Sequence, residues 1–171
     1  MLKWDLSPPP KVTFDLILSK AKYHIIWGGN YFELPPSRMF LIYDKGGSMY
    51  GRTFAECEQA WCSWDGNARI KKLTPPTHNG KEIKQHPTQK PIQIMKWCIE
   101  QLPPGCETIL DPYLGSGTTL VACAKMGRKG IGIEIDEDYF NIACKRVEEA
   151  YKSPDLFIEA AKKAEQIVIE I

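Results

Sequence analysis

The stretch DPYLGSGTT, residues 111–119, determines how this chain folds, because it joins an apolar segment, 108–110, to a segment with helical spacing, 117–126. A second apolar segment, GIGIEID at 130–136, follows, and residues 137–150 again have helical spacing. This β-α-β-α order predicts an α/β fold with parallel strands and right-handed crossovers. We refer to residues 111–119 as the glycine turn.

The glycine turn has the features of a ligand site. Gly115 and Gly117 lack a Cβ and let a bound molecule approach the backbone, while the helix start offers unpaired N–H groups. Ser116 or Thr118 is expected to cap that helix. Glu134, nineteen residues beyond Gly115, is placed at the end of the next predicted strand, where a carboxylate can bind two ribose hydroxyls. The alternative is that the glycines merely form a tight turn.

Phosphate-binding glycine motifs are absent from the sequence. It contains neither GxGxxG nor the Gly-Lys-Ser/Thr of a P-loop. A nucleoside cofactor without a phosphate chain is therefore favoured.

Apolar patterns elsewhere in the chain predict further elements. A helix is expected around residues 14–21 and another at 92–102, with strands at 24–27, 39–43, 59–64 and 69–71.

Composition indicates an ordinary globular chain of one domain. With 171 residues, 43% of them hydrophobic, the chain can bury a sizeable core. The net charge of +1 does not by itself indicate a nucleic-acid partner. Six cysteines without zinc-ligand spacing are expected to be reduced, mostly buried thiols, with no metal site. Because no leader or membrane-length apolar run is present, we expect a cytoplasmic protein with no membrane partner.

Two motifs resemble those of the amino-group DNA methyltransferases. The glycine turn is similar to their D-P-F-x-G-S-G-T-T cofactor motif, and HPTQKP at 86–91 is similar to their H-P-T-x-K-P motif. The motif order resembles a permuted, phage-type class in which the catalytic half comes first. The resemblance covers about residues 12 to 150 and implies a Rossmann-like S-adenosylmethionine-dependent methyltransferase fold with a mostly parallel sheet, whose central catalytic-motif strand is short or missing.

The resemblance also divides the single domain, residues 1–171, into parts. These are a catalytic-half remnant at 12–72, a basic loop at 72–85, a cofactor-binding half at 86–150 and a C-terminal tail at 151–171.

The resemblance implies a site for S-adenosylmethionine. The residues expected around its methionine portion are Asp111, Tyr113, Gly115, Ser116, Gly117 and Thr118, with Glu134 at the ribose and Thr88, Lys90 and Pro91 closing the pocket. For Lys90 the alternative is a solvated lysine at a helix start. Asn30, Tyr31 and Phe32 are expected to line the adenine or target-base pocket, the alternative for the two aromatic residues being core packing.

The family's catalytic tetrapeptide, Asp/Asn/Ser-Pro-Pro-Tyr/Phe/Trp, has no intact copy in this sequence. The nearest string is Ser7-Pro8-Pro9, followed by Pro10 where the stacking aromatic belongs. Either the chain lacks its catalytic segment, through truncation, a split gene or loss of activity, or Ser7, Pro8 and Pro9 form a degenerate site. The missing strand is expected between the strands ending at Asp111 and Trp27, filled by residues 2–6 or by a second chain.

A basic stretch supplies the expected contacts to DNA. Lys72, Lys81 and Lys84 are predicted to bind phosphates, the alternative being a solvated surface. The function implied is transfer of a methyl group from S-adenosylmethionine to the exocyclic amine of adenine, or of cytosine, in DNA, as in restriction-modification. The alternatives are an RNA or small-molecule methyltransferase and an inactive subunit that binds cofactor or DNA.

Overall fold

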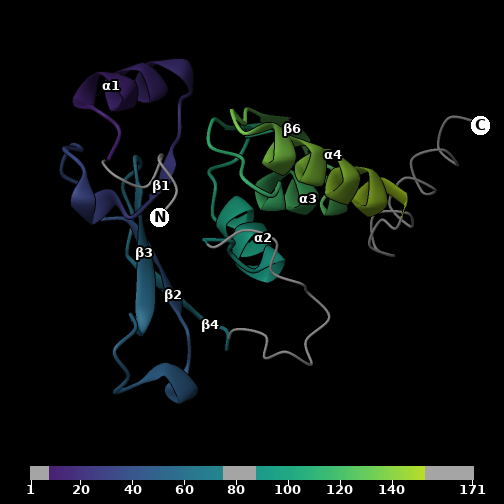
Figure 1. Ribbon diagram of the computed structural model, residues 1–171. Helices are drawn as coiled ribbons and strands as arrows, with labels where there is room; N and C mark the ends of the chain where they lie inside the picture. The colour runs from purple at the N-terminus through teal and green to yellow at the C-terminus, as the bar shows by residue number, and fades with distance from the viewer. Residues whose placement is uncertain (1–7, 75–87, 153–171) are drawn as a thin grey trace, which may run out of the picture. The chain divides into compact units, whose positions relative to one another are not determined.

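The computed structural model describes residues 8–74 and 88–152, which belong to two compact units, Met1–Pro75 and Pro76–Ile171 (Figure 1). We call them the N-terminal and C-terminal units and describe each by itself. No helix within the two described ranges is long and apolar enough to cross a membrane.

The N-terminal unit opens with the helix α1, Lys11–Lys20. Pro10 precedes the helix in an extended conformation, with φ −67° and ψ 157°. Pro8 and Pro9 each precede a proline and are therefore disfavoured in the helical region, so the helix begins only after the proline run. Phe14 is its buried residue.

A mixed four-stranded sheet forms the rest of this unit, in the order β1-β3-β2-β4 (Figure 1). β3 runs antiparallel to β1 and β2, whereas β4 is parallel to β2. The expectation of mostly parallel strands is therefore wrong for this sheet. The connection from β2 to β3 contains no α-helix, and parallel neighbours generally need a helical crossover. The strands are β1 Ile25–Trp27, β2 Phe40–Asp44, β3 Cys57–Cys62 and β4 Arg69–Lys72, with short 3-10 turns η2 Gly29–Tyr31 and η3 Gly47–Met49.

Alternation along β2 builds the core of the N-terminal unit. Leu41 and Tyr43 are buried, while their neighbours in the strand are half-buried. Trp61 of β3 is also buried, and its indole N–H donates to the carbonyl of Pro35 at 2.8 Å. The buried indole of Trp61 thus keeps its N–H hydrogen-bonded.

The C-terminal unit has the predicted β-α-β-α order. β5, Thr108–Asp111, lies parallel to β6, Lys129–Gly132, and α3, Thr118–Lys125, connects them. α3 packs against both strands and against α2, Ile92–Glu100, and α4, Glu137–Lys152 (Figure 1). Most of α3 is buried, because small residues let its neighbours approach closely.

β6 ends two residues before Glu134, earlier than the predicted strand. Pairing continues irregularly beyond it, since the N–H of Ile133 donates to the carbonyl of Asp111 at 2.9 Å. The N–H of Leu114 in turn donates to the carbonyl of Ile133 at 3.0 Å. These two bonds draw the segment after β6 against the glycine turn.

All six cysteines are free, as predicted, but only three of them, Cys62, Cys98 and Cys123, are buried, so the expectation of mostly buried thiols is met by half of them. Burial raises the pKa of the Cys62 thiol to about 12. No cluster of three metal-ligating side chains occurs among the described residues.

The missing central strand is predicted to lie between the strands that end at Asp111 and Trp27, which are β5 and β1. Among the described residues β1 pairs with β3 alone, and β5 pairs with β6 alone. Residues 2–6 lie outside the described ranges, so the central strand stays a prediction.

Candidate functional site

The glycine turn reverses the chain between β5 and α3. Gly115 and Gly117 have φ values of 56° and 82°, in the left-handed region that favours glycine. A Cβ built on Gly117 would lie 2.9 Å from the Cβ of Ala143 in α4. Gly117 is therefore required by the turn and by close helix packing, a reason different from the room for a ligand that its sequence position suggested.

The predicted side-chain cap of α3 is wrong. The N-cap position is Gly117, which has no side chain, and no side-chain capping bond is made. Ser116 and Thr118 are both buried and use their hydroxyls elsewhere, as acceptors from Arg146 Nη1 at 2.9 and 3.2 Å.

Asp111 ends β5 and organises the turn from inside. Its Oδ1 accepts the N–H of Tyr113 at 3.0 Å, and its Oδ2 accepts the Thr119 hydroxyl at 2.6 Å. Burial raises the pKa of the Asp111 carboxyl, and the nearby charge of Glu134 adds to the rise. The site is thus electronegative and relatively dry, which suits a cation.

Glu134, in the segment that follows β6, supports the turn from its other side. Its Oε2 accepts the N–H of Gly115 at 2.6 Å, and its Oε1 accepts the N–H of Asp136 at 2.9 Å. Asp136 in turn caps α4, because its Oδ1 accepts the N–H groups of Asp138 and Tyr139 at 3.0 and 3.1 Å. Glu134 therefore has a structural task in addition to the predicted contact with a ribose.

Ser116 links the turn to two residues that the sequence did not single out. Its hydroxyl donates to Oε1 of Gln89 at 2.9 Å, and its carbonyl accepts from Nη1 of Arg146. Gln89 stands inside the HPTQKP motif, but at its variable position. Arg146 lies on α4, thirty residues from Ser116, and no local spacing marks such a partner.

Residues 88–91 are brought to the glycine turn through Gln89. Thr88 is exposed, whereas Lys90 and Pro91 are half-buried, and Pro91 precedes α2 in an extended conformation. A pocket wall at this place stays a prediction for Thr88, Lys90 and Pro91. His86 lies outside the described residues.

The predicted base-pocket residues separate into two kinds. Phe32 packs on Phe14 of α1 with ring centroids 4.3 Å apart, so its ring belongs to the fold. Tyr31 is 78% exposed at the end of η2, after the carboxyl end of β1, and Asn30 beside it is also exposed. Tyr31 and Asn30 are free to face a ligand.

The predicted catalytic and phosphate-binding residues lie partly within the described ranges and partly outside them. Pro8 is exposed and Pro9 half-buried ahead of α1, and Lys72 ends β4 with its ammonium 5.7 Å from the centre of the Tyr50 ring. Ser7, Lys81 and Lys84 lie outside the described residues.

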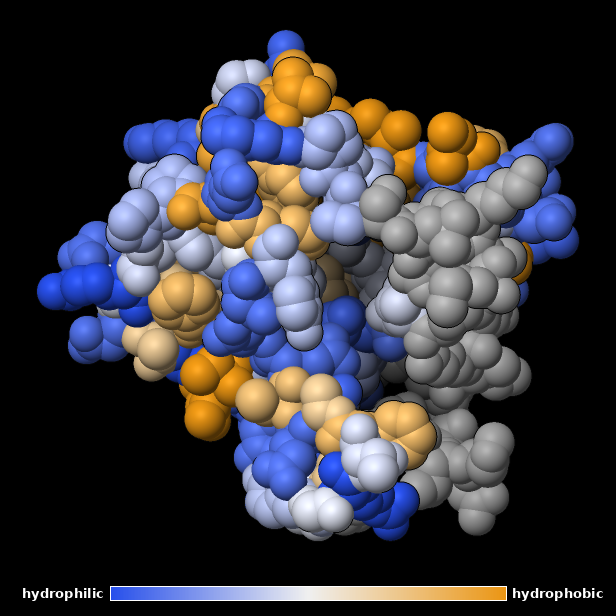
Figure 2. All heavy atoms as spheres, turned by 60° about the vertical axis from the view of Figure 1, so that its left-hand side comes forward, coloured by the Kyte–Doolittle hydropathy of each residue, from blue (hydrophilic) through white to orange (hydrophobic). Residues whose placement is uncertain are grey.

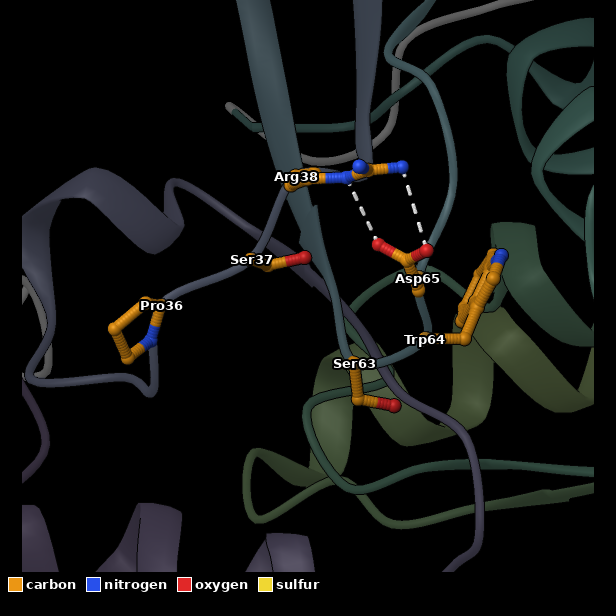
Figure 3. Close-up of a pocket in the computed structure, with 6 residues that line it drawn as sticks. All are labelled: Pro36, Ser37, Arg38, Ser63, Trp64 and Asp65. Carbon is orange, nitrogen blue, oxygen red and sulfur yellow. Dashed lines mark hydrogen bonds and ion pairs between the residues drawn. The ribbon is translucent and has the colours of Figure 1, made fainter.

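A hollow of about 330 Å³ lies in the N-terminal unit (Figure 3). Arg38 and Asp65 form an exposed ion pair there at 3.0 Å, of a kind worth at most about 1 kcal/mol. None of the predicted site residues lines it, so the glycine turn is the candidate site. The lining residues are Pro36, Ser37, Arg38, Ser63, Trp64 and Asp65.

Comparison with known families agrees with the motifs at the turn. The N6/N4 DNA methylase family model matches residues 14–145, more than half of the chain. The chain belongs to this family. The amino-group DNA methyltransferase resemblance is thereby confirmed.

Curated relatives are type II methyltransferases. M.ScaI of Streptomyces caespitosus is 46% identical over 72 residues, which are 42% of this chain and 24% of that protein. M2.DpnII of Streptococcus pneumoniae is 44% identical over 64 residues, which are 37% of this chain and 24% of that protein. The chain thus spans about a quarter of the length of these relatives.

A solved structure has a similar fold. The crystal structure of the M1.HpyAVI–SAM complex is 28% identical, with a TM-score of 0.50, and the match covers 63% of this chain and 60% of that one. The predicted Rossmann-like α/β fold is confirmed.

Proposed function

We propose that this chain binds S-adenosylmethionine at the glycine turn and takes part in transferring the methyl group of this cofactor to the exocyclic amine of a DNA base. Adenine is favoured over cytosine as the target base. One observation carries the proposal. In a member of the DNA methylase family, two carboxylates and a glycine-lined turn meet at the carboxyl ends of β5 and β6, where open α/β folds bind ligands.

The residues present fit this cofactor. Its sulfonium and ammonium groups are cations, and a cation beside Asp111 offsets the two effects that raise the pKa of that carboxyl, burial and the charge of Glu134. Asp111, Tyr113 and residues 115–118 would hold the methionine portion, and Glu134 would bind the ribose through lone pairs not used by Gly115 and Asp136. The similar structure of M1.HpyAVI is a complex with SAM, which supports the choice of cofactor.

The segment before α2 completes the proposed pocket. The bond from Ser116 to Gln89 holds residues 88–91 at the turn, which supports Thr88, Lys90 and Pro91 as its wall. A lysine ammonium there would pair with the carboxylate of the methionine portion.

The cofactor supplies an electrophilic methyl group, and the protein contributes position and electrostatics. The lone pair of the target amine forms the new N–C bond as the C–S bond breaks, and the amine then loses one proton. Asn30 and Tyr31 are proposed to contact the target base, Tyr31 by stacking. Lys72, Lys81 and Lys84 are proposed to bind phosphates.

A second candidate function is cofactor and DNA binding without transfer, as one subunit of an assembly. It is favoured by the absence of an Asp/Asn/Ser-Pro-Pro-Tyr/Phe/Trp string from the 171 residues. The hydrogen-bond acceptor for the target amine would then come from a second chain. If the chain is instead active with a degenerate catalytic motif, Ser7, Pro8 and Pro9 would supply this acceptor.

Calorimetry with S-adenosylmethionine, followed by transfer of labelled methyl groups to unmethylated duplex DNA, tests the proposal. Binding with transfer supports the enzyme, and mass spectrometry of the nucleosides distinguishes N6-methyladenine from N4-methylcytosine. Binding without transfer supports the subunit. Loss of transfer in Ser7→Ala, with cofactor affinity retained, would assign the acceptor to Ser7. A folded chain that binds no cofactor would refute both functions.

A further inference from the structure

Positive charge is concentrated on one edge of the N-terminal sheet. The whole chain has a net charge of only +1, yet β4 reads Arg-Ile-Lys-Lys and no acidic residue occurs between residues 66 and 74. All four residues of β4 are exposed. Among the described residues, this strand is the end strand of its sheet and pairs with β2.

Three cations of this edge and of the neighbouring segment 45–56 have no ion-pair partner among the described residues. Within the described ranges Arg52, Arg69 and Lys71 make no ion pair, so their charges face solvent. Three other cations of the N-terminal unit are ion-paired at 2.7 to 3.0 Å, namely Lys11 with Asp15, Arg38 with Asp65 and Lys45 with Glu58.

The β2–β3 loop, residues 45–56, is attached to the end of β4. The Tyr50 hydroxyl donates to both carboxylate oxygens of Asp44 at 2.8 and 2.7 Å, and the Lys72 ammonium lies over the Tyr50 ring. Gly46 lies so close to Thr74 that an added Cβ would be 2.8 Å from its hydroxyl oxygen. The edge strand and the loop therefore form one continuous surface.

The loop presents an aromatic ring and a further cation to solvent. Phe54 is 68% exposed and Arg52 is exposed, although the loop is ordered by a bond from the Gly51 N–H to Glu56 at 2.7 Å. Figure 2 shows hydrophilic and apolar residues side by side on the lower lobe, where this loop lies. Lysines on an end strand discourage sheet-to-sheet association, but that purpose does not account for Arg52 and Phe54.

We propose that Arg52, Arg69, Lys71 and Phe54 form a contact surface for duplex DNA, the cations on phosphates and the ring against the groove edge. The proposal rests on DNA as the substrate of the proposed function. Exposed, unpaired arginine and lysine side chains release counterions from a phosphate backbone, which gives affinity without sequence preference. We call these four residues the β4 surface.

The test measures binding of the full chain to a fluorescent duplex by anisotropy over a series of salt concentrations. The double variant Arg69→Gln/Lys71→Gln should lower the slope of log K against log salt by about 1.8, and the affinity about 30-fold at ~0.15 M salt. Phe54→Ala should weaken binding several-fold with the slope unchanged. The control Lys20→Gln/Lys22→Gln removes the same charge near the end of α1 and should leave the slope as it is.

An unchanged slope in Arg69→Gln/Lys71→Gln would overturn the proposal, as would an equal loss in the control, no binding by the wild-type chain at low salt, or preference for duplex RNA. Thermal melting confirms that each variant is folded. Calorimetry with S-adenosylmethionine separates the two hypotheses. If Arg69→Gln/Lys71→Gln lowers the salt slope in a chain that binds no cofactor, the β4 surface is supported and the proposed function is refuted.

Discussion

Replacing Glu134 separates its two roles, the brace of the glycine turn and the proposed ribose ligand. Glu134→Ala removes the acceptor of two backbone N–H groups, those of Gly115 and Asp136. Hydrogen bonds to a charged group contribute about 1.5–3 kcal/mol each when buried. Because Glu134 is half-buried, water can replace part of the lost hydrogen bonding. We therefore expect the unfolding free energy to fall by roughly 2 kcal/mol.

For a chain of this length, that loss lowers the melting temperature by about 4–8 °C. Glu134→Gln retains one acceptor oxygen and should lose about half as much. Both variants should weaken S-adenosylmethionine binding roughly 10- to 150-fold, from the loss of charge-assisted bonds to the ribose. Differential scanning fluorimetry without cofactor and calorimetry with it measure the two effects.

The exposed Glu148→Ala on α4 is the matched control, with little effect expected on either measurement. An unchanged melting temperature in Glu134→Ala would refute the claim that Glu134 stabilises the glycine turn. Unchanged affinity in a folded Glu134→Gln would remove Glu134 from the cofactor site.

Three further outcomes are expected. Gly117→Ala should lose roughly 2–4 kcal/mol of unfolding free energy in urea titration, from left-handed strain and the clash with Ala143; a loss under ~1 kcal/mol would contradict this. The raised pKa of Asp111 means that the folded chain holds this proton more tightly than the unfolded chain, so stability should fall as the pH rises through the window above ~4. Asp111→Asn should remove that pH dependence in thermal melts and abolish cofactor binding, and an identical pH profile would refute the assignment. Arg146→Met should raise the KM for S-adenosylmethionine more than it lowers kcat, with partial rescue by Arg146→Lys; equal behaviour of Arg146→Met and the exposed control Lys145→Met would exclude Arg146 as a positioning residue.

Local sequence patterns determined which elements form and where the site lies. Helical and strand periodicity placed α2, α3, β5 and β6 to within a few residues, because the spacing of apolar residues within a segment determines which face of that segment is hydrophobic. The glycine turn was recognisable for the same reason, since positive φ values and a strand-to-helix reversal depend on adjacent residues.

Tertiary structure alone decided what the polar groups of that site do. Glu134 meets Gly115 across nineteen residues, Gln89 meets Ser116 across 27, and Arg146 meets Ser116 across 30. The packing of α4 and of the segment before α2 against the turn brings Arg146 and Gln89 to Ser116, and the spacing of these residues in the sequence does not encode either contact. Buried polar groups must be hydrogen-bonded, and in this turn Gln89 and Arg146, which no local pattern had marked, bond to Ser116.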